Sequence, residues 1–231
     1  MESINNSTFQ FSADALQSAG IARLAYIRKV YSYFFVGILV AVGGALLTMN
    51  SDLVFTIAAH PWISLIVMIG AVFFASASAK NPSRALPTLL LFTFISGAVI
   101  SPTLYAIANG YIKGTGPGLI YNALALTTLV FAALTTYAFV SKKDFSYMGA
   151  SLTIGLFMVI GVSILNIFIA SSSLDLALSF IIVLLFSGFI LYDTSKILKN
   201  AHAIPPTLAA LNLYLDFLNL FMALLRIMRR D

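Results

Sequence analysis

The sequence of 231 residues contains no cysteine and little charge of either sign. Without cysteine the chain can form no disulfide, no thiol nucleophile and no thiolate metal site. Charged residues make up only 9% of the chain, against roughly 25% in soluble domains, and 60% of the residues are hydrophobic. A water-exposed surface cannot be built from so few charges. The composition therefore excludes an ordinary soluble domain and indicates a membrane protein.

Long runs without any charge separate the few charged residues. A helix needs about 20 residues to cross the hydrocarbon core, and helices satisfy their own backbone polar groups in lipid. We therefore predict an all-α membrane protein, a bundle of seven transmembrane helices with boundaries near residues 30–49, 62–79, 86–109, 117–140, 148–170, 174–195 and 207–227. Residues 1–25 are polar and small, and we expect a loosely ordered tail there, followed by a single membrane domain over residues 26–231.

Lysine and arginine are concentrated in loops on the side of the N-terminal tail. Only Lys113 and the C-terminal group Arg226, Arg229 and Arg230 fall on the opposite side. The positive-inside rule then predicts a cytoplasmic N-terminus. The same rule accounts for the net charge of +5, so no nucleic-acid partner is expected. With no cleavable signal sequence recognised, we expect an integral protein of a bacterial inner (plasma) membrane, with the lipid bilayer as its main partner.

Two carboxylates, Asp193 and Asp216, lie inside predicted spans. Ionisable groups at such depth are costly, and they face the bundle interior or a watered cavity rather than lipid. Asp216 shares one helix face with Asn212 and Asn219, because these residues recur at steps of three and four. The last two spans are joined by a short loop and must be antiparallel neighbours. Asp193 and Asp216 can therefore lie in the same half of the bundle.

Structural roles for these carboxylates remain open. Asp193 could pair with Lys196 or Lys199 at the membrane interface, and Asp216 could accept a hydrogen bond from a buried Asn or Tyr. If the two carboxyl groups meet, they cannot both ionise cheaply, and they share one proton that holds the two helices together. Loss of that proton leaves two anions that repel each other or admit a cation. Ca²⁺ prefers oxygen ligands, which the carboxylates and amides could supply.

Several segments resemble the signature of the Bax inhibitor-1 family, the transmembrane Bax-inhibitor-motif proteins. They are LYDTSKIL and LNLYLDFLNLFMALLRI in the last two spans, FISGAVISP, VSKKDFSYMGA, and NIFI from Asn166. The resemblance covers about residue 25 to the end. It implies a seventh helix surrounded by the other six. It also implies a pH-sensitive Ca²⁺ leak whose sensor corresponds to Asp193 and Asp216. Asn166, with Asn212 and Asn219, is a candidate for the supporting polar residues.

The family resemblance also raises the question of a basic partner for the carboxylates. Leak-type members place a basic residue on the second helix, near the aspartates. The span 62–79 has none, so Lys80 or Arg84 at its end, or Lys196 on the sixth span, is a candidate substitute. The resulting expectation is a passive leak for Ca²⁺ gated by protons, with no resident cofactor and no enzymatic activity.

Three other functions were weighed against the leak. Bacterial relatives that lack one or both carboxylates bind a membrane-bound ATP-dependent protease, so a regulatory interaction protein is the main alternative. An intramembrane aspartyl protease would match Tyr192-Asp193, but Asp216 is preceded by LYL rather than G-x-G, and no P-A-L motif follows. Transport of another solute could use the hydroxyls of Thr127 and Thr128, although such hydroxyls usually bond their own helix.

Overall fold

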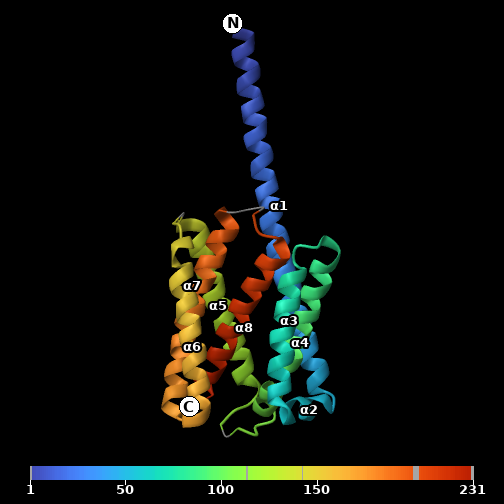
Figure 1. Ribbon diagram of the computed structural model, residues 1–231, viewed down its shortest axis with the longest axis vertical. Helices are drawn as coiled ribbons and strands as arrows, with labels where there is room; N and C mark the ends of the chain where they lie inside the picture. Colours follow the sequence, from blue (N-terminus) through green and yellow to red (C-terminus); the bar gives the residue numbers. More distant parts are fainter. Residues whose placement is uncertain (1, 113, 142, 200–202, 230–231) are drawn as a thin grey trace.

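A computed structural model describes residues 2–112, 114–141, 143–199 and 203–229 of the chain, with side chains described from Ser18 onward. Every regular element in these ranges is a helix (Figure 1). In chain order they are α1 (Glu2–Met49), α2 (Leu53–Ala59), α3 (Pro61–Ser78), α4 (Pro82–Ala108), α5 (Pro117–Ser141), the 3₁₀ helix η1 (Ser146–Met148), α6 (Gly149–Ile169), α7 (Ser172–Lys199) and α8 (Pro206–Met228).

Seven of the described helices are long and apolar enough to cross a membrane: α1, α3, α4, α5, α6, α7 and α8. They match the seven predicted spans to within a few residues at most ends, and the all-α membrane class is confirmed. Proline explains several of the boundaries. α3, α4, α5 and α8 each begin at a proline, where the missing backbone N–H would have no helical partner in any case.

Two local features differ from the sequence-based expectation. The tail over residues 1–25, expected to be loosely ordered, is helical in the structure from Glu2, and α1 projects beyond the bundle (Figure 1). No proline precedes Pro61, so nothing stops the transmembrane helix from continuing back through the alanine- and leucine-containing stretch before it. The short helix α2 was not predicted, because its seven residues are too few for a span.

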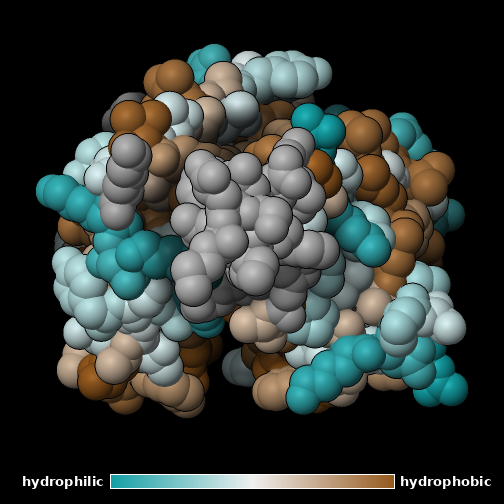
Figure 2. Space-filling view, turned by 90° about the horizontal axis from the view of Figure 1, so that it is seen from above, coloured by the Kyte–Doolittle hydropathy of each residue, from teal (hydrophilic) through white to brown (hydrophobic). Residues whose placement is uncertain are grey.

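The flanks of the bundle are apolar, whereas hydrophilic side chains gather around the end from which α1 projects, here called the tail end (Figure 2). Large exposed side chains such as Leu39, Phe73 and Phe157 cover the flanks. This distribution is the reverse of a soluble protein and fits a surface in contact with acyl chains. Lys113, Lys142 and Arg230, which entered the charge argument, lie outside the described residues.

Helix α8 is the most buried of the seven spans, with 72% of its most apolar window inside the protein. It packs against α1, α3, α4, α5 and α7. A buried hydrogen bond of 2.5 Å between the hydroxyls of Tyr214 and Ser96 joins it to α4. A complete ring of six helices around α8 is not confirmed, because a cavity lies between α8 and α6.

Glycines allow α1 and α4 to approach each other closely. A Cβ atom added to Gly97 would collide with the backbone carbonyl of Ala41, and one added to Gly44 would collide with the carbonyl of Phe94. Small residues of this kind let helix backbones meet where lipid supplies no hydrophobic driving force. The contact fixes α1 against the rest of the bundle.

We expect Gly44→Ala to destabilise the protein by about 1–3 kcal/mol, since the new methyl group meets rigid backbone rather than a mobile side chain. The matched control is Gly43→Ala on the same helix, because a Cβ at Gly43 meets no atom within 4 Å. Thermal unfolding in detergent, followed by circular dichroism, measures both variants. Equal melting temperatures for the two variants would contradict the proposed close contact.

Candidate functional site

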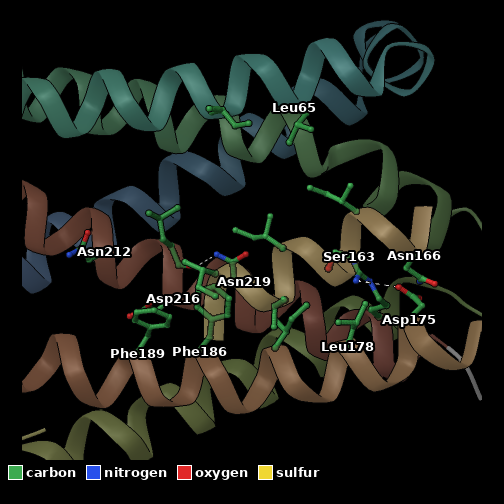
Figure 3. Close-up of a pocket in the computed structure, with 18 of the residues that line it drawn as sticks. Leu65, Ser163, Asn166, Asp175, Leu178, Phe186, Phe189, Asn212, Asp216 and Asn219 are labelled. Atoms are coloured by element: carbon green, nitrogen blue, oxygen red, sulfur yellow. Dashed lines mark hydrogen bonds and ion pairs between the residues drawn. The ribbon is translucent and has the colours of Figure 1, made fainter. Parts of the chain in front are cut away.

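A cavity of about 970 Å³ lies along one face of α8 and is bordered by α3, α6 and α7. Its polar lining on α8 is the predicted stripe of Asn212, Asp216 and Asn219, together with Arg226, while apolar side chains such as Leu65 and Phe186 form the walls (Figure 3). At about 1.5 Å per residue, the distance along α8 from Asn212 to Arg226 is roughly 21 Å. The cavity, here called the α8 cavity, therefore follows much of the thickness of a membrane.

Asp193 and Asp216 meet in this cavity, in the part of it nearer the tail end. Asp193 lies on α7 and Asp216 on α8, with 7% and 4% of their surfaces exposed. Their carboxyl groups are within hydrogen-bonding reach of each other. Among the described residues, no donor reaches the buried Oδ2 atom of Asp216. Two carboxylates without a proton would repel each other at this distance, whereas a pair that shares one proton would attract.

Lys196 is the basic residue beside the carboxyl pair. It lines the α8 cavity together with Asp193, and its ammonium group acts on Asp193 electrostatically. The same group donates a hydrogen bond of 3.2 Å to the hydroxyl of Tyr192 and lies 4.8 Å from the centre of that ring. One positive charge therefore stands next to two carboxyl groups. A pair that retains one proton carries one negative charge, which Lys196 balances.

The other two candidate partners lie elsewhere. Lys80 and Arg84 are exposed at the start of α4 and do not line the α8 cavity. The prediction that either replaces the missing basic residue of the second span is not supported by their position. The physical reason is that α7 itself continues for six residues beyond Asp193. Lys196, only three residues after Asp193, therefore already faces the same cavity.

Three asparagines add amide groups to the α8 cavity. The Asn212 side chain lies within hydrogen-bonding reach of Asp193. Asn219 donates from Nδ2 to the backbone carbonyl of Leu215 at 2.7 Å, which leaves its Oδ1 atom as an acceptor. Asn166 lines the far end of the cavity, where its Oδ1 accepts a hydrogen bond of 3.2 Å from the backbone of Ser171. The structure thus brings the three predicted amides to one cavity, at different depths.

An ion pair that sequence reasoning missed stands at the end of the cavity away from the carboxyl pair. The Nη1 atom of Arg226 on α8 lies 3.5 Å from the Oδ1 atom of Asp175 on α7, and the two side chains are 36% and 28% exposed (Figure 3). Asp175 lies near the start of α7, and Arg226 lies near the end of α8. Because the two helices are antiparallel neighbours, these two ends lie on the same side of the membrane, so the ion pair could have been predicted from the sequence. The α8 cavity is thus more exposed here than at Asp193 and Asp216.

A polar connection ties the segment before η1 to the last turns of α7. Lys199 and Asp144 form an ion pair of 2.9 Å, and Ser195 accepts a hydrogen bond from the backbone N–H of Phe145 at 3.1 Å. The backbone N–H of Ser146 and the Lys199 ammonium hold the pKa of the Asp144 carboxyl well below its usual range. Asp144 therefore stays ionised near neutral pH, and its stabilising contribution is lost only when the pH falls into the acidic range.

Two of the hydroxyls on α5, the fourth span, bond to their own helix. Thr127 and Thr128 on α5 donate to the backbone carbonyls of Ala123 and Leu124, at 2.7 and 2.8 Å. Neither side chain lines the α8 cavity. Within the described residues, no cluster of three or more acidic or histidine side chains could hold a metal ion.

The fold and the site define a polytopic helical membrane protein with a buried carboxyl pair facing an intramembrane cavity. Residues 23–231 match the family described as "Inhibitor of apoptosis-promoting Bax1". The chain therefore belongs to the Bax inhibitor-1 family, as its last two spans indicated.

Relatives of the chain include bacterial, viral and mouse proteins. An uncharacterized protein of Campylobacter jejuni is 37% identical over 206 residues, which cover 88% of this chain and 87% of the relative. An uncharacterized membrane protein of Vibrio cholerae is 39% identical over 73% of this chain and 75% of its own length. A Vaccinia virus protein described as a Golgi anti-apoptotic protein is 31% identical over 95% of this chain and 91% of its own length.

Proposed function

We propose that this protein is a passive, pH-sensitive leak for Ca²⁺ across a bacterial inner membrane, with its N-terminus in the cytoplasm. The observation that carries the proposal is the meeting of Asp193 and Asp216 in the α8 cavity. Described basic residues at the tail end, such as Arg28 and Lys29, support the orientation. The cavity supplies a path along α8, and the carboxyl pair supplies a barrier that responds to protons.

The closed state is the one in which the carboxyl pair retains a proton. The shared hydrogen then joins α7 to α8, and Lys196 balances the remaining negative charge. Other titratable or charged groups that line the cavity are Tyr192 on α7 and, at the far end, Asp175 and Arg226. The cavity-lining residues of α3 and α6 carry no charge. The carboxyl pair is therefore the group whose charge changes next to the barrier.

Loss of the proton changes the net charge of the carboxyl pair and Lys196 together from zero to one uncompensated negative charge. The two carboxylates then repel each other in a poorly solvated site, where such repulsion is strong. Ca²⁺ relieves this repulsion because it binds carboxylate and amide oxygens, which Asp193, Asp216 and the Oδ1 atom of Asn219 can offer. Few oxygens converge at any one depth, so binding is weak enough for the ion to leave. Flux is therefore expected to rise with pH.

The test is Ca²⁺ uptake by proteoliposomes that contain a fluorescent Ca²⁺ indicator, measured in steps from mildly acidic to mildly alkaline pH. We expect uptake above that of protein-free liposomes, low at acidic pH and increasing as the pH rises. An ionophore added at each pH controls for indicator response and vesicle integrity. Uptake equal to that of empty liposomes at every pH would remove the leak proposal.

A second candidate function is regulation of a membrane-bound ATP-dependent protease or another membrane protein. The observation that favours it is the projection of α1 beyond the bundle at the tail end (Figure 1). Such a helix could reach a neighbouring complex. Affinity capture from bacterial membranes, comparing the full chain with a chain that lacks residues 1–17, tests this function. A partner retained equally by both chains would exclude the projecting helix as the docking element.

A further inference from the structure

A second hollow, lined by apolar side chains, lies on the side of α8 away from the α8 cavity. This apolar crevice has a volume of about 350 Å³, with walls from α1, α4 and α5. Its floor is formed by Tyr214, Phe217 and Phe221 of α8, all of them buried. The crevice and the α8 cavity share no lining residue. It therefore belongs to a different surface from the candidate ion path.

The crevice arises from a change in side-chain size along α1. Nearer the tail end, α1 and α5 meet through stacked rings, Phe34 on Phe131, with centroids 4.8 Å apart and planes at 13°. Further along, α1 presents Ala41 and Ala45 one turn apart, and both line the crevice. Alanine is too small to fill the space that two phenylalanine rings fill about two to three turns earlier. The helices are thus held apart with a gap between them.

The mouth of the crevice faces the surface that contacts lipid. Val42 and Leu46 of α1 and Tyr121 of α5 line it and are 44%, 53% and 69% exposed. These residues lie within candidate membrane spans, which fits a mouth in contact with lipid. Water would find no partner at the floor, since the Tyr214 hydroxyl is already bonded to Ser96. An empty crevice would forfeit dispersion contacts along all its walls.

We infer that the apolar crevice binds one acyl chain of a phospholipid from the leaflet opposite the tail end. The chain enters between α1 and α5 and packs against the rings of Phe217 and Phe221. The occupant is the lipid that surrounds the mouth. No charged side chain lines the crevice, and its hydroxyls are those of Tyr121 at the mouth and Tyr214, which is bonded to Ser96. The site therefore selects for alkyl chains and not for headgroups.

Binding at this place has a consequence for gating that rests on the proposed function. Asp216 faces the α8 cavity, and its neighbour Phe217 faces the crevice, so the bound chain packs behind the helix that carries the sensor. A permanently filled crevice restricts movement of α8 away from α7. A filled variant is thus expected to show lower Ca²⁺ flux at alkaline pH, with the carboxyl pair itself unchanged.

The experiment uses tryptophan fluorescence, because the chain has a single tryptophan, Trp62, which can be removed. A Trp62→Phe, Phe221→Trp protein carries its one indole on the crevice floor. It is reconstituted into vesicles of phosphatidylcholine with brominated acyl chains as the only lipid, and into unbrominated vesicles. The matched control, Trp62→Phe with Phe73→Trp, carries its indole on the exposed flank of α3. Iodide serves as the quencher from water.

We expect brominated chains to quench both indoles, and we expect Ala45→Phe to remove most of the quenching at position 221 while leaving position 73 unaffected. If Ala45→Phe fails to fold, Ala41→Leu fills the same crevice. Absence of quenching at position 221, equal quenching in the filled protein, or quenching by iodide overturns acyl-chain binding. This readout does not depend on ion flux. Loss of quenching in a filled variant whose flux is unchanged overturns the regulatory link alone.

Discussion

Asp216→Asn is expected to abolish the rise of Ca²⁺ flux with pH and to leave flux near its acidic value throughout. Asparagine has almost the same shape, and its amide can donate permanently to the Asp193 carboxylate as the shared proton does. The variant therefore imitates the protonated pair and cannot lose its hydrogen. It also removes one anionic ligand. A loss of about 1.4 kcal/mol in cation binding corresponds to a tenfold change, so we expect flux at alkaline pH to fall at least about tenfold.

The control for this experiment is Asp52→Asn, which removes an exposed carboxylate from the segment before α2. Its pH profile should match that of the unmodified protein. Asp193→Asn should behave as Asp216→Asn does, because either side chain can hold the donated hydrogen. Unmodified pH profiles in both variants would show that the carboxyl pair is a structural feature without a role in gating.

Lys196→Gln is expected to move the onset of flux toward alkaline pH, by about one pH unit. The Lys196 charge balances the single negative charge of the protonated pair and reduces the electrostatic cost when the second negative charge appears. Without it, loss of the proton leaves two uncompensated charges in a poorly solvated site, so opening requires a higher pH. Uptake by proteoliposomes over the same pH series measures the shift.

Lys80→Gln and Arg84→Gln are the matched controls for Lys196→Gln. Each removes one positive charge from the same end of the bundle, but from exposed positions that do not line the α8 cavity. In both variants the pH at which Ca²⁺ flux begins to rise should equal that of the unmodified protein. An equal shift in all three variants would mean that net surface charge, and not the position of Lys196, sets the pH of opening.

The fold was largely predictable because lipid imposes strict rules on sequence. Charge-free runs of sufficient length had to be helices, and prolines marked where they begin. The same rules placed Asp216, Asn212 and Asn219 on one inward face, since a polar stripe has no place against acyl chains. The proximity of Asp193 to Asp216 followed from the short loop between α7 and α8, because that loop forces the two helices to be antiparallel neighbours.

Features that depend on how distant helices pack could not be predicted in this way. The family resemblance implied that six helices surround the seventh, whereas the structure leaves a cavity between α6 and α8. Of the three candidate basic partners, Lys196 lies beside the carboxyl pair and Lys80 and Arg84 do not, because α4 begins away from the pair, which sequence cannot show. The crevice at Ala41 and Ala45 depends on which side chains α5 presents opposite them. The length of α1 is not predictable from composition, because a polar segment can continue a helix that begins in the membrane.

Infrared difference spectroscopy of the reconstituted protein tests the shared proton most directly, because a protonated carboxyl group and a carboxylate absorb at different frequencies. The account predicts a band from a protonated carboxyl group at acidic pH that disappears over the same pH range in which Ca²⁺ flux rises, and that is missing from Asp216→Asn. A spectrum without such a band, or a band that titrates outside the range of the flux, would contradict the claim that Asp193 and Asp216 hold the path closed through one proton.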